Sequence, residues 1–556
     1  MDKLMEITIG NVLEQVANEY PNDEAVKYIT RDYRRTWSEF NKEVDQVAKG
    51  FMAIGINKGD HVAIWATNVP EWLLTLFACA KIGAVLVTVN TNYKVFELEY
   101  LLRQSDAKAL VMVKKTKHMD YVEIINELCP TLEDQVPNEI NFSTLPCLKS
   151  IIVEGKDSET PAGTMGFEKL FELADSVSEE DYNNLKAQQD IHDVINIQYT
   201  SGTTGFPKGV MLTHYNIVNN GKSIGDRMKF THEDKLCIPV PFFHCFGLVL
   251  AIMACITHST SMVPLEAYNP TDFLRALDEE ECTAIHGVPT MYIAALEHPD
   301  FKKYKFPKLR TGIMAGSPCP IKVMQQVINE MGASEITIAF GQTESSPVCT
   351  MTATDDAIEH RVSSVGRKMP FVECKIVDPE TGETLGPNQQ GEFCARGYNI
   401  MKGYYKMEEA TAQVIDKDGW LHYGDLCTVD EDGYYRVTGR IKDMIIRGGE
   451  NIYPKELEEF IYTIDKVRDV QVIGVPSEQY GEEIMACIIL KDGEFMTEKE
   501  VKDIMSSHIA HYKIPKYIEF VDSFPMNGAG KIQKFKMREW AVEKLNLQKA
   551  DAIETA

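Results

Sequence analysis

The stretch "YTSGTTGFPKG", from Tyr199 to Gly209, follows the β-branched run "DVINIQ" and gives the first indication of the fold. The run predicts a buried strand. The loop after it has three glycines, one serine, three threonines, one proline and one lysine in eleven residues. Gly202, Gly205 and Gly209 allow a positive φ, so backbone N–H groups can turn inward around an anion, and hydroxyl groups add further donors. The stretch therefore predicts either a phosphate-binding loop or a polar surface turn.

The Walker phosphate-binding loop does not explain this stretch. Five residues after Gly202 comes Pro207 instead of a glycine, and Lys208 is followed by Gly209. The Walker mechanism needs a serine or threonine after the lysine to bind Mg²⁺. A different kind of phosphate chemistry is therefore expected.

Length and charge bound the class of protein. The chain has 556 residues and a formal net charge of −26. That length predicts two to four domains or lobes. An acidic surface repels polyanions, so nucleic acid is not expected as a partner, and an anionic cofactor would need a local basic site.

Cysteine usage and the start of the chain favour a cytoplasmic protein. The thirteen cysteines include no C-x-x-C pair, so no metal or disulfide framework is expected. The start "MDKLMEITIG" lacks the pattern of a signal peptide. The apolar stretch from Trp72 to Val89 contains Lys81, which favours a helix followed by a buried strand over a membrane span.

Helix and strand patterns alternate through roughly the first 440 residues, which predicts an α/β fold with largely parallel sheets. The segment "TWSEFNKEVDQVAKGFMAIG" predicts a helix with Thr36 as N-cap, Glu39 in a capping box and Gly55 after its end. "HVAIWAT" and "AKALVMV" predict strands, and "PKELEEFIYTI" predicts a helix.

Short strands with turn signals begin near Gly391 and predict an antiparallel β subdomain. A smaller unit with its own strands and helices follows Arg440. We therefore predict a large N-terminal domain, residues 1–440, in which helices sandwich parallel-rich sheets and a β subdomain is attached. Residues 441–556 are predicted to form a small mobile α+β domain.

Four further stretches carry a family resemblance. They are "PFFHCFG" (241–247), "AFGQTES" (339–345), the segment from Tyr423 to Glu458 that contains "KDMIIRGGENIYP", and "NGAGKIQK" (527–534). With the opening loop, they occur in the order and rough spacing of the adenylate-forming enzymes. The details most resemble the ACSF-type medium-chain acyl-CoA synthetases, and the resemblance covers nearly the whole chain.

The resemblance implies an AMP-forming acid–CoA ligase. ATP would convert a carboxylic acid to an acyl-adenylate with release of pyrophosphate, and the CoA thiol would then displace AMP. Both steps concentrate negative charge around phosphate, so cations and N–H donors are required. The implied cofactor is Mg²⁺, with ATP, CoA and a small carboxylic acid as substrates, and the implied assembly is a monomer or homodimer.

The resemblance also implies roles for particular residues. Lys531 would stabilise the adenylation transition state, His244 would orient the acid, Thr343 would contact the α-phosphate and Glu344 would hold Mg²⁺. The residues implied to bind nucleotide or CoA are Thr200, Ser201, Gly202, Thr203, Thr204, Gly205, Lys208, Gly316, Ser317, Phe340, Gly341, Thr343, Asp425, Arg440, Lys442, Gly448 and Gly449.

For four of these sites, the resemblance implies a more specific role. Phe340 would stack on adenine, and Asp425 would accept the ribose hydroxyls. Lys442 would be the hinge about which the small domain rotates between half-reactions, and the glycines of "RGGEN" would line the CoA channel. From the residues alone, Phe340 could equally be a core side chain, a lone histidine such as His244 is more often a core residue, and Lys531 could be a solvated loop residue.

The acid is expected to be a medium-chain fatty acid. The matching pocket residues are His244, Val288, Ala315, Gly316 and Gly341, and they offer no cation for a second carboxylate. An aryl or alicyclic acid remains an alternative. Transfer of the acyl group to a carrier protein, or a catalytically inactive nucleotide-binding protein of the same fold, are further alternatives.

Overall fold

The computed structural model describes residues 3–117, 119–200, 207–316, 319–447, 450–477, 480–506, 511–527 and 531–548. Contacts divide the chain into two compact units. The first comprises Met1–Val362, Gly366–Glu373 and Ala395–Leu421, and the second comprises Ser363–Val365, Cys374–Cys394 and His422–Ala556. The boundary expected near residue 440 would delimit the domain that is predicted to rotate, and it remains a prediction.

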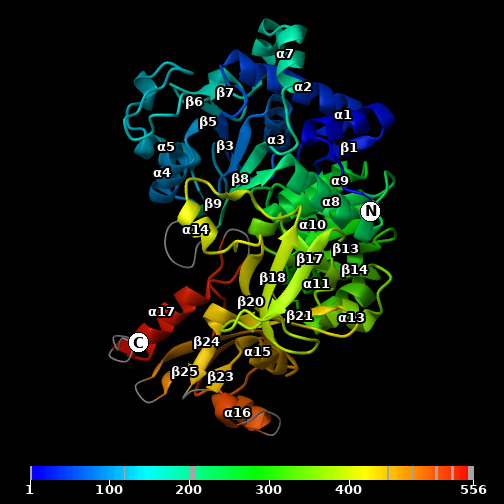
Figure 1. Cartoon of the computed structure of the whole chain (residues 1–556), viewed down its shortest axis with the longest axis vertical. Helices are drawn as coiled ribbons and strands as arrows, with labels where there is room; N and C mark the ends of the chain where they lie inside the picture. The colour runs from blue at the N-terminus through cyan, green and yellow to red at the C-terminus, as the bar shows by residue number, and fades with distance from the viewer. Residues whose placement is uncertain are drawn as a thin grey trace. The chain divides into compact units, whose positions relative to one another are not determined.

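One sheet of the first unit contains the strand before the opening loop (Figure 1). Its strands, in spatial order, are β19 (Gly403–Tyr404), β9 (Lys208–Thr213), β8 (Val194–Thr200), β4 (Val85–Thr88), β3 (His61–Trp65), β5 (Ala107–Met112), β6 (Ser150–Val153) and β7 (Met165–Gly166). From β8 to β7 the pairs are parallel, whereas β9 and β19 are added antiparallel at one edge. β4 is buried along its whole length, as apolar strands covered on both faces require.

The second sheet of this unit has the same plan. Its order is β16 (Arg367–Lys368), β15 (Val348–Met351), β14 (Glu335–Gly341), β13 (Thr311–Met314), β12 (Ala284–Gly287), β10 (Lys235–Ile238), β11 (Ser261–Pro264), β1 (Glu24–Lys27) and β2 (Arg34–Thr36). The pairs from β14 to β1 are parallel, and β15, β16 and β2 are antiparallel additions. The expected α/β architecture with parallel-rich sheets is confirmed.

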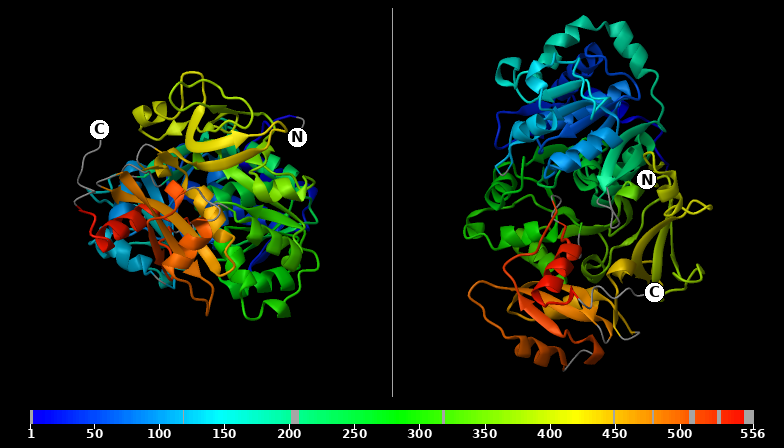
Figure 2. Two further views of the ribbon diagram at one scale, coloured as in Figure 1. Left: turned by 90° about the horizontal axis from the view of Figure 1, so that it is seen from below. Right: turned by 90° about the vertical axis from the view of Figure 1, so that its left-hand side faces the viewer.

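Helices flank the sheets of the first unit, as Figures 1 and 2 show from three directions. They are α1 (Ile9–Glu19), α2 (Trp37–Ala53), α3 (Pro70–Ile82), α4 (Val95–Gln104), α5 (Tyr121–Leu128), α6 (Glu168–Leu173), α7 (Glu179–Lys186), α8 (His214–Met228), α9 (Ala254–Ile256), α10 (Pro270–Glu279), α11 (Pro289–Leu296), α12 (Ile321–Gln326), α13 (Ile358–Ser363) and α14 (Glu408–Ala412). Short 3₁₀ segments are η1 (Leu132–Asp134), η2 (Asp157–Glu159), η3 (Ala174–Ser176), η5 (Phe301–Lys303) and η7 (Thr343–Ser345), and π-helical segments are η4 (Phe246–Met253) and η6 (Val327–Met331).

Local signals explain several helix ends. At α2, the Thr36 side chain accepts the N–H of Glu39, and the Glu39 carboxylate accepts the N–H of Thr36, so the expected capping box is confirmed. Gly55 follows the helix with a φ of 84°. The apolar stretch with Lys81 forms α3 and β4, as expected. Across the described residues, no helix combines the length and the apolar character that crossing a bilayer needs.

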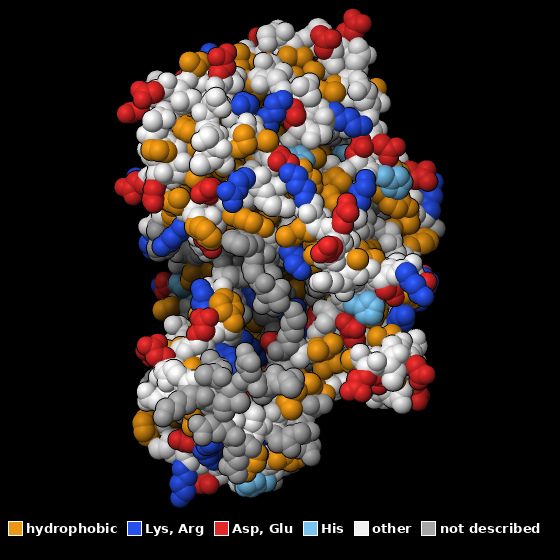
Figure 3. Space-filling model, turned by 60° about the vertical axis from the view of Figure 1, so that its left-hand side comes forward, with side chains coloured by type: hydrophobic (Ala, Val, Ile, Leu, Met, Phe, Trp, Pro, Cys, Tyr) orange, Lys and Arg blue, Asp and Glu red, His pale blue; other side chains and the backbone are white. Residues whose placement is uncertain are grey.

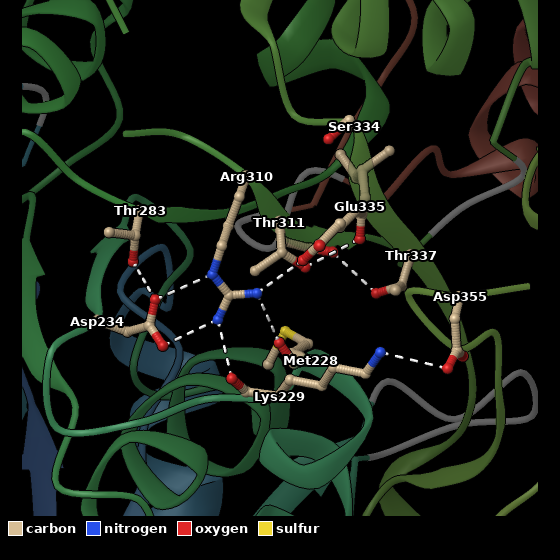
Figure 4. A network of polar contacts seen from close by, with 12 residues as sticks. Met228, Lys229, Asp234, Thr283, Arg310, Thr311, Ser334, Glu335, Thr337 and Asp355 are labelled. Atoms are coloured by element: carbon tan, nitrogen blue, oxygen red, sulfur yellow. Dashed lines mark hydrogen bonds and ion pairs between the residues drawn. The ribbon is translucent and has the colours of Figure 1, made fainter. Parts of the chain in front are cut away.

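A guanidinium network anchors helix α8 to the sheet of β14 (Figure 4). Arg310 donates to the carbonyls of Met228 and Lys229 at the end of α8, at 3.0 and 2.9 Å. The same side chain forms ion pairs with Asp234 and Glu335, both at 2.8 Å. These bonds satisfy carbonyls that a helix end leaves without intrahelical partners. They fix a helix whose other side chains support the site described below.

Two further sheets lie largely in the second unit. The first has the order β17 (Val372–Val377), β18 (Gly391–Gly397), β20 (Leu421–Val429) and β21 (Tyr435–Arg440). The other has the order β23 (Glu450–Ile452), β22 (Ile445–Arg447), β25 (Gly481–Leu490) and β24 (Val467–Ser477), with β26 (Tyr517–Phe520) also paired to β25. The remaining elements are η8 (Ile441–Asp443), α15 (Pro454–Tyr462), α16 (Glu498–Ser506), η9 (His511–Lys513) and α17 (Lys534–Lys544).

Side chains along β24 point alternately to the two faces of the sheet that contains β25, and both faces are buried. Val470 and Val472 point into one apolar cluster with residues of α15 and α16, whereas Ile473 and Val475 point into another with residues of α17. The period of two is the ordinary geometry of a strand. The expected β subdomain and small α+β unit are therefore both present.

Charged side chains of both signs are mixed on the surface, and most cysteines are buried. On the face drawn in Figure 3, basic side chains are scattered among acidic ones. Every cysteine lies in a described segment and is free, and Cys237, Cys255, Cys282 and Cys487 are buried small side chains.

Candidate active site

In the first unit, the "GQTES" segment leaves the end of β14 as the short helix η7. Thr343 and Glu344 are only 7% and 9% exposed, so the glutamate is not a solvated turn residue. Gly341 has to be a glycine, because a Cβ there would overlap the carbonyl oxygen of Pro347. The tight packing holds a polar pair almost buried at the carboxyl end of a parallel strand, where α/β proteins place ligands.

Glu344 is held by a segment that sequence reasoning did not select. The Tyr404 hydroxyl donates to Glu344 Oε1 at 2.8 Å, and the Met401 N–H donates to the Glu344 carbonyl at 2.8 Å. Burial, and then the charge of Glu344, raises the pKa of the Tyr404 phenol well above its usual range. The tyrosine therefore stays protonated and serves as a permanent donor to the carboxylate.

Tyr404 also links Glu344 to the lysine of the opening loop. Tyr404 pairs with Val210 in the antiparallel contact of β19 with β9, and Lys208 Nζ lies 5.0 Å from the centre of the Tyr404 ring. This distance is within the range of a cation–π interaction. The geometry thus brings together Lys208 and Glu344, two residues that the sequence analysis selected on separate motifs.

Buried amides hold the backbone after Glu344. Asn399 Nδ2 donates to the Ser345 carbonyl at 2.9 Å. Asn220, on α8, donates to the Val348 carbonyl and accepts the Val348 N–H, at 2.9 and 3.1 Å. Because all of these groups are buried, breaking one of the bonds would leave a polar atom unsatisfied. The segment is therefore rigidly supported.

The opening loop joins two antiparallel strands. Thr200 ends β8 and pairs with Lys208, which begins β9. Ser201, Gly202, Thr203, Thr204 and Gly205 lie outside the described residues. Gly209 was expected to supply a positive φ, but this is wrong. It lies within β9, and it is a glycine because a Cβ would come within 2.8 Å of the Ile197 side chain.

Cys245 lies between Thr343 and the neighbouring His244. Cys245 Sγ is 3.7 Å from Thr343 Oγ1 and 3.9 Å from His244 Nδ1. The Phe246 N–H donates to His244 Nδ1 at 3.1 Å, so a neutral imidazole carries its proton on Nε2. Burial raises the pKa of the Cys245 thiol to about 12, which keeps it a neutral packing group. The buried π-helix η4, a feature often found at functional sites, starts directly afterwards.

The residues expected around adenine and the acid are partly brought together. Gly316 has a φ of 90°, and a Cβ there would lie 3.1 Å from Val288 Cγ1. Ala315 and Val288 are buried. Phe340 lies at the end of β14, half-buried and paired with Thr350. Ser317 lies outside the described residues.

The second unit carries a separate polar pair. Asp425 on β20 faces Arg440 on β21, and Arg440 Nε donates to Asp425 Oδ1 at 2.6 Å. Burial raises the pKa of the Asp425 carboxyl, and the positive charges of Arg440 and Lys531 oppose that rise. Asp425 is 5% exposed, so its ionisation depends on these cations.

Lys531 is exposed, and its backbone is fixed by Asn527. The Lys531 N–H donates to Asn527 Oδ1 at 2.9 Å, and the Asn527 N–H donates to the Lys531 carbonyl at 2.8 Å. Lys442 lies in η8, the short connection between β21 and β22, and its side chain lies outside the described atoms. Gly448 and Gly449 also lie outside the described residues.

Comparison with known proteins shows to which family the chain belongs. Residues 13–405 match the AMP-binding enzyme family, and residues 456–531 match the AMP-binding enzyme C-terminal domain. The chain belongs to the AMP-binding enzymes. This confirms the expected family, and the shared activity is that of an acyl-CoA ligase acting through an acyl-adenylate.

Relatives of this AMP-binding enzyme span its whole length. It is 51% identical over 547 residues to YngI of Bacillus subtilis (strain 168), which is provisionally named an acyl-CoA synthetase; the match covers 98% of this chain and 99% of YngI. It is 41% identical to the mitochondrial medium-chain acyl-CoA ligase ACSF2 of Danio rerio, with 98% and 90% covered. The solved anthranilate CoA ligase AuaEII aligns with a TM-score of 0.86 at 26% identity, covering 98% and 99%.

The donor set of this AMP-binding enzyme suits a hard cation beside ATP. Magnesium prefers oxygen ligands and retains several waters and phosphate oxygens. Glu344 supplies a nearly buried carboxylate whose Oε1 is fixed by Tyr404. Among the described residues, none donates a hydrogen bond to Oε2, so this oxygen remains available as a ligand atom. The residues present therefore fit Mg²⁺.

Proposed function

We propose that this AMP-binding enzyme activates medium-chain fatty acids as their CoA thioesters. The observation that carries the proposal is the 41% identity to the medium-chain ligase of Danio rerio over 98% of this chain. The buried Val288 supports it, because its Cγ1 would lie 3.1 Å from a Cβ at Gly316 and an apolar wall suits an alkyl chain.

In the first half-reaction, one oxygen of the substrate carboxylate attacks the α-phosphorus of ATP, and pyrophosphate leaves. Thr343 donates its hydroxyl to the α-phosphate, and Lys208 and the loop before it bind the outer phosphates. Glu344, oriented by Tyr404, would hold Mg²⁺, which neutralises phosphate charge when bound. Lys531 balances the charge that moves between the attacking and the leaving oxygens.

In the second half-reaction, the CoA thiol loses its proton and its sulfur attacks the acyl carbonyl, and AMP leaves with the electron pair of the acyl–phosphate bond. Asp425 and Arg440 bind the ribose through both steps. His244, with its proton on Nε2, orients the acyl group. Rotation about Lys442 exchanges Lys531 for the face that carries Gly448 and Gly449.

Rates with a series of acids test the proposal. Pyrophosphate release and acyl-CoA formation are measured with acids from acetate to palmitate. Each buried methylene contributes about 0.8 kcal/mol, so kcat/KM should rise several-fold per CH₂ from C4 and peak at medium chain length. A maximum at acetate would contradict the proposal.

A second candidate is an aryl acid ligase, because the anthranilate ligase aligns over nearly the whole chain. Benzoate and cyclohexanecarboxylate therefore belong in the series, and a preference for either would favour this candidate. Omitting CoA gives a further control. An enzyme that loads a carrier protein would form acyl-AMP but would not consume CoA.

A further inference from the structure

A cluster of three different donor side chains lies on the sheet of β20, outside the proposed nucleotide-binding residues. It comprises Glu392 and Cys394 on β18 and His422 on β20. Their ligand atoms all lie within 4.8 Å of one another. Glu392 Oε2 is 2.8 Å from His422 Nδ1, and Cys394 Sγ is 3.5 Å from the same nitrogen.

Strand geometry explains why these donors converge. Glu392 and Cys394 are two residues apart, so they project from the same face of β18. His422 projects toward them from the neighbouring strand. The other face of the pair is aromatic, with the Phe393 and Tyr423 rings 4.8 Å apart. The cluster is thus part of the sheet itself and does not depend on a loop.

We propose that Glu392, Cys394 and His422 bind a zinc ion. Carboxylate, thiolate and imidazole are the ligands that Zn²⁺ takes, and two anionic ligands neutralise its charge. Adjacent ligands of tetrahedral zinc lie roughly 3.3–3.8 Å apart, given bonds of about 2.0–2.3 Å. The sulfur–nitrogen separation already fits, and the carboxylate–imidazole separation has to widen by about 0.5 Å.

The site is distinct from the proposed magnesium position. Mg²⁺ prefers oxygen ligands, whereas this cluster offers sulfur and nitrogen. Along β20 burial alternates, with Tyr423 and Asp425 buried and His422 and Gly424 half-buried. Asp425 therefore points to the opposite face from His422, and zinc would not occupy the ribose position.

Glu392 has a second contact, which places the proposed metal next to β20, the strand that carries Asp425. Its Oε1 accepts the N–H of Gly424 at 3.0 Å, and Gly424 has a φ of 68°. The carboxylate would thus bind zinc through Oε2 and keep its hydrogen bond through Oε1. Because hydrogen-bonded ligands are held in orientation, this contact favours metal binding.

Cobalt spectroscopy on the full chain tests the proposal, which does not depend on the identity of the acid. Chelator-treated enzyme is titrated with Co²⁺ and then with Zn²⁺. A thiolate-to-cobalt charge-transfer band should saturate at one cobalt per chain and disappear as zinc displaces cobalt. Absence of a saturable band would overturn the proposal.

Variants localise the site. Cys394→Ser should abolish the band, and His422→Gln should weaken metal binding more than ~10-fold, since losing even an outer partner of a ligand costs that much. Cys147→Ser is the matched control, because Cys147 is exposed and outside the cluster, and it should bind like the wild type. A band that survives in Cys394→Ser would overturn the proposal.

X-ray absorption of the zinc-loaded wild type keeps the test independent of how the variants fold. One sulfur and two or three nitrogen or oxygen neighbours are expected. A shell without sulfur would contradict the proposed site.

Discussion

The hydroxyl of Tyr404 donates to the carboxylate of Glu344 at 2.8 Å, and this bond joins two segments that are far apart in the sequence. The phenol stays protonated because burial and the glutamate charge raise its pKa. Glu344 is therefore oriented before any ligand arrives. A carboxylate that is already oriented loses less conformational freedom when it binds a cation.

Tyr404→Phe should weaken adenylation. Without the hydroxyl, Glu344 loses its fixed orientation, and we expect a ~10- to 100-fold fall in kcat/KM for ATP with a higher Mg²⁺ requirement. Pyrophosphate release at several Mg²⁺ concentrations measures both. Tyr405→Phe is the control, because the Tyr405 hydroxyl donates to Asp106. Equal effects of the two variants would show that Tyr404 does not act through Glu344.

Arg440→Ala should shift the pH dependence of ATP use. Burial raises the pKa of Asp425, and the Arg440 charge opposes this rise, so removing the arginine raises that pKa further. The carboxylate has to be ionised to accept two ribose hydroxyls. The acidic limb of kcat/KM for ATP should therefore move to higher pH. The midpoint of that limb is the readout, because Arg440 could also affect the rate by contacting ATP.

Arg436→Ala serves as the comparison for this measurement. Arg436 lies on the same strand, β21, with its guanidinium near the Ser363 hydroxyl. Its removal should leave the midpoint unchanged. If both variants keep the wild-type midpoint, Asp425 does not control the acidic limb.

Val288→Phe should shift the substrate preference toward acids with shorter chains. Val288 is buried, and its Cγ1 lies on the side of Gly316 to which a Cβ would point, so a larger ring would occupy space proposed for the alkyl chain. We expect kcat/KM for the longest substrates to fall by at least ~10-fold relative to butyrate, since each excluded methylene forfeits about 0.8 kcal/mol. Val288→Ile tests whether a modest gain in volume gives a smaller shift. An unchanged optimum in both would place the acid elsewhere.

Asp469 should make the stability of the second unit depend on pH. Burial raises the pKa of its carboxyl to about 6, although the Tyr462 hydroxyl and the Val470 N–H both donate to it. The folded state binds the proton more tightly than the unfolded state does. The stabilisation is therefore complete below pH 3.8 and is lost as the pH rises through about 6.

Asp469→Asn keeps both acceptor contacts without the charge. Its free energy of unfolding should exceed that of the wild type increasingly from pH 4 to pH 7, by up to about 3 kcal/mol at ~1.4 kcal/mol per unit. Denaturant unfolding across this range gives the difference. Asp492→Asn, at a fully exposed position, should show no such trend. A constant difference for Asp469→Asn would mean that folding does not raise the pKa of this carboxyl.

Local signals predicted much of the fold. The Thr36 and Glu39 capping box and the helix followed by a strand in the stretch with Lys81 depend on neighbours within a few residues, and the structure has both. Such patterns are visible in a single sequence because helix caps and strand faces have short periods.

Pairing between distant segments could not be predicted in the same way. Tyr404 reaches Glu344 because β19 joins β9, and the short run "GYYK" gives no sign of its partner strand. The cluster that contains Cys394 and His422 likewise forms because β18 and β20 are neighbours in a sheet. The spacing of these residues in the sequence therefore does not reveal a metal site. Gly209 was misread because a close approach to Ile197, and not a positive φ, requires the glycine.

The rates of the two half-reactions in the Lys531→Ala variant test the proposed mechanism most directly, because Lys531 is proposed to act in adenylation alone. Acyl-AMP formation from acid and ATP should fall at least ~10²-fold, the scale of one lost electrostatic stabiliser. Conversion of supplied acyl-AMP and CoA to acyl-CoA should stay within a few-fold of the wild-type rate. An equal loss in both half-reactions would contradict the account.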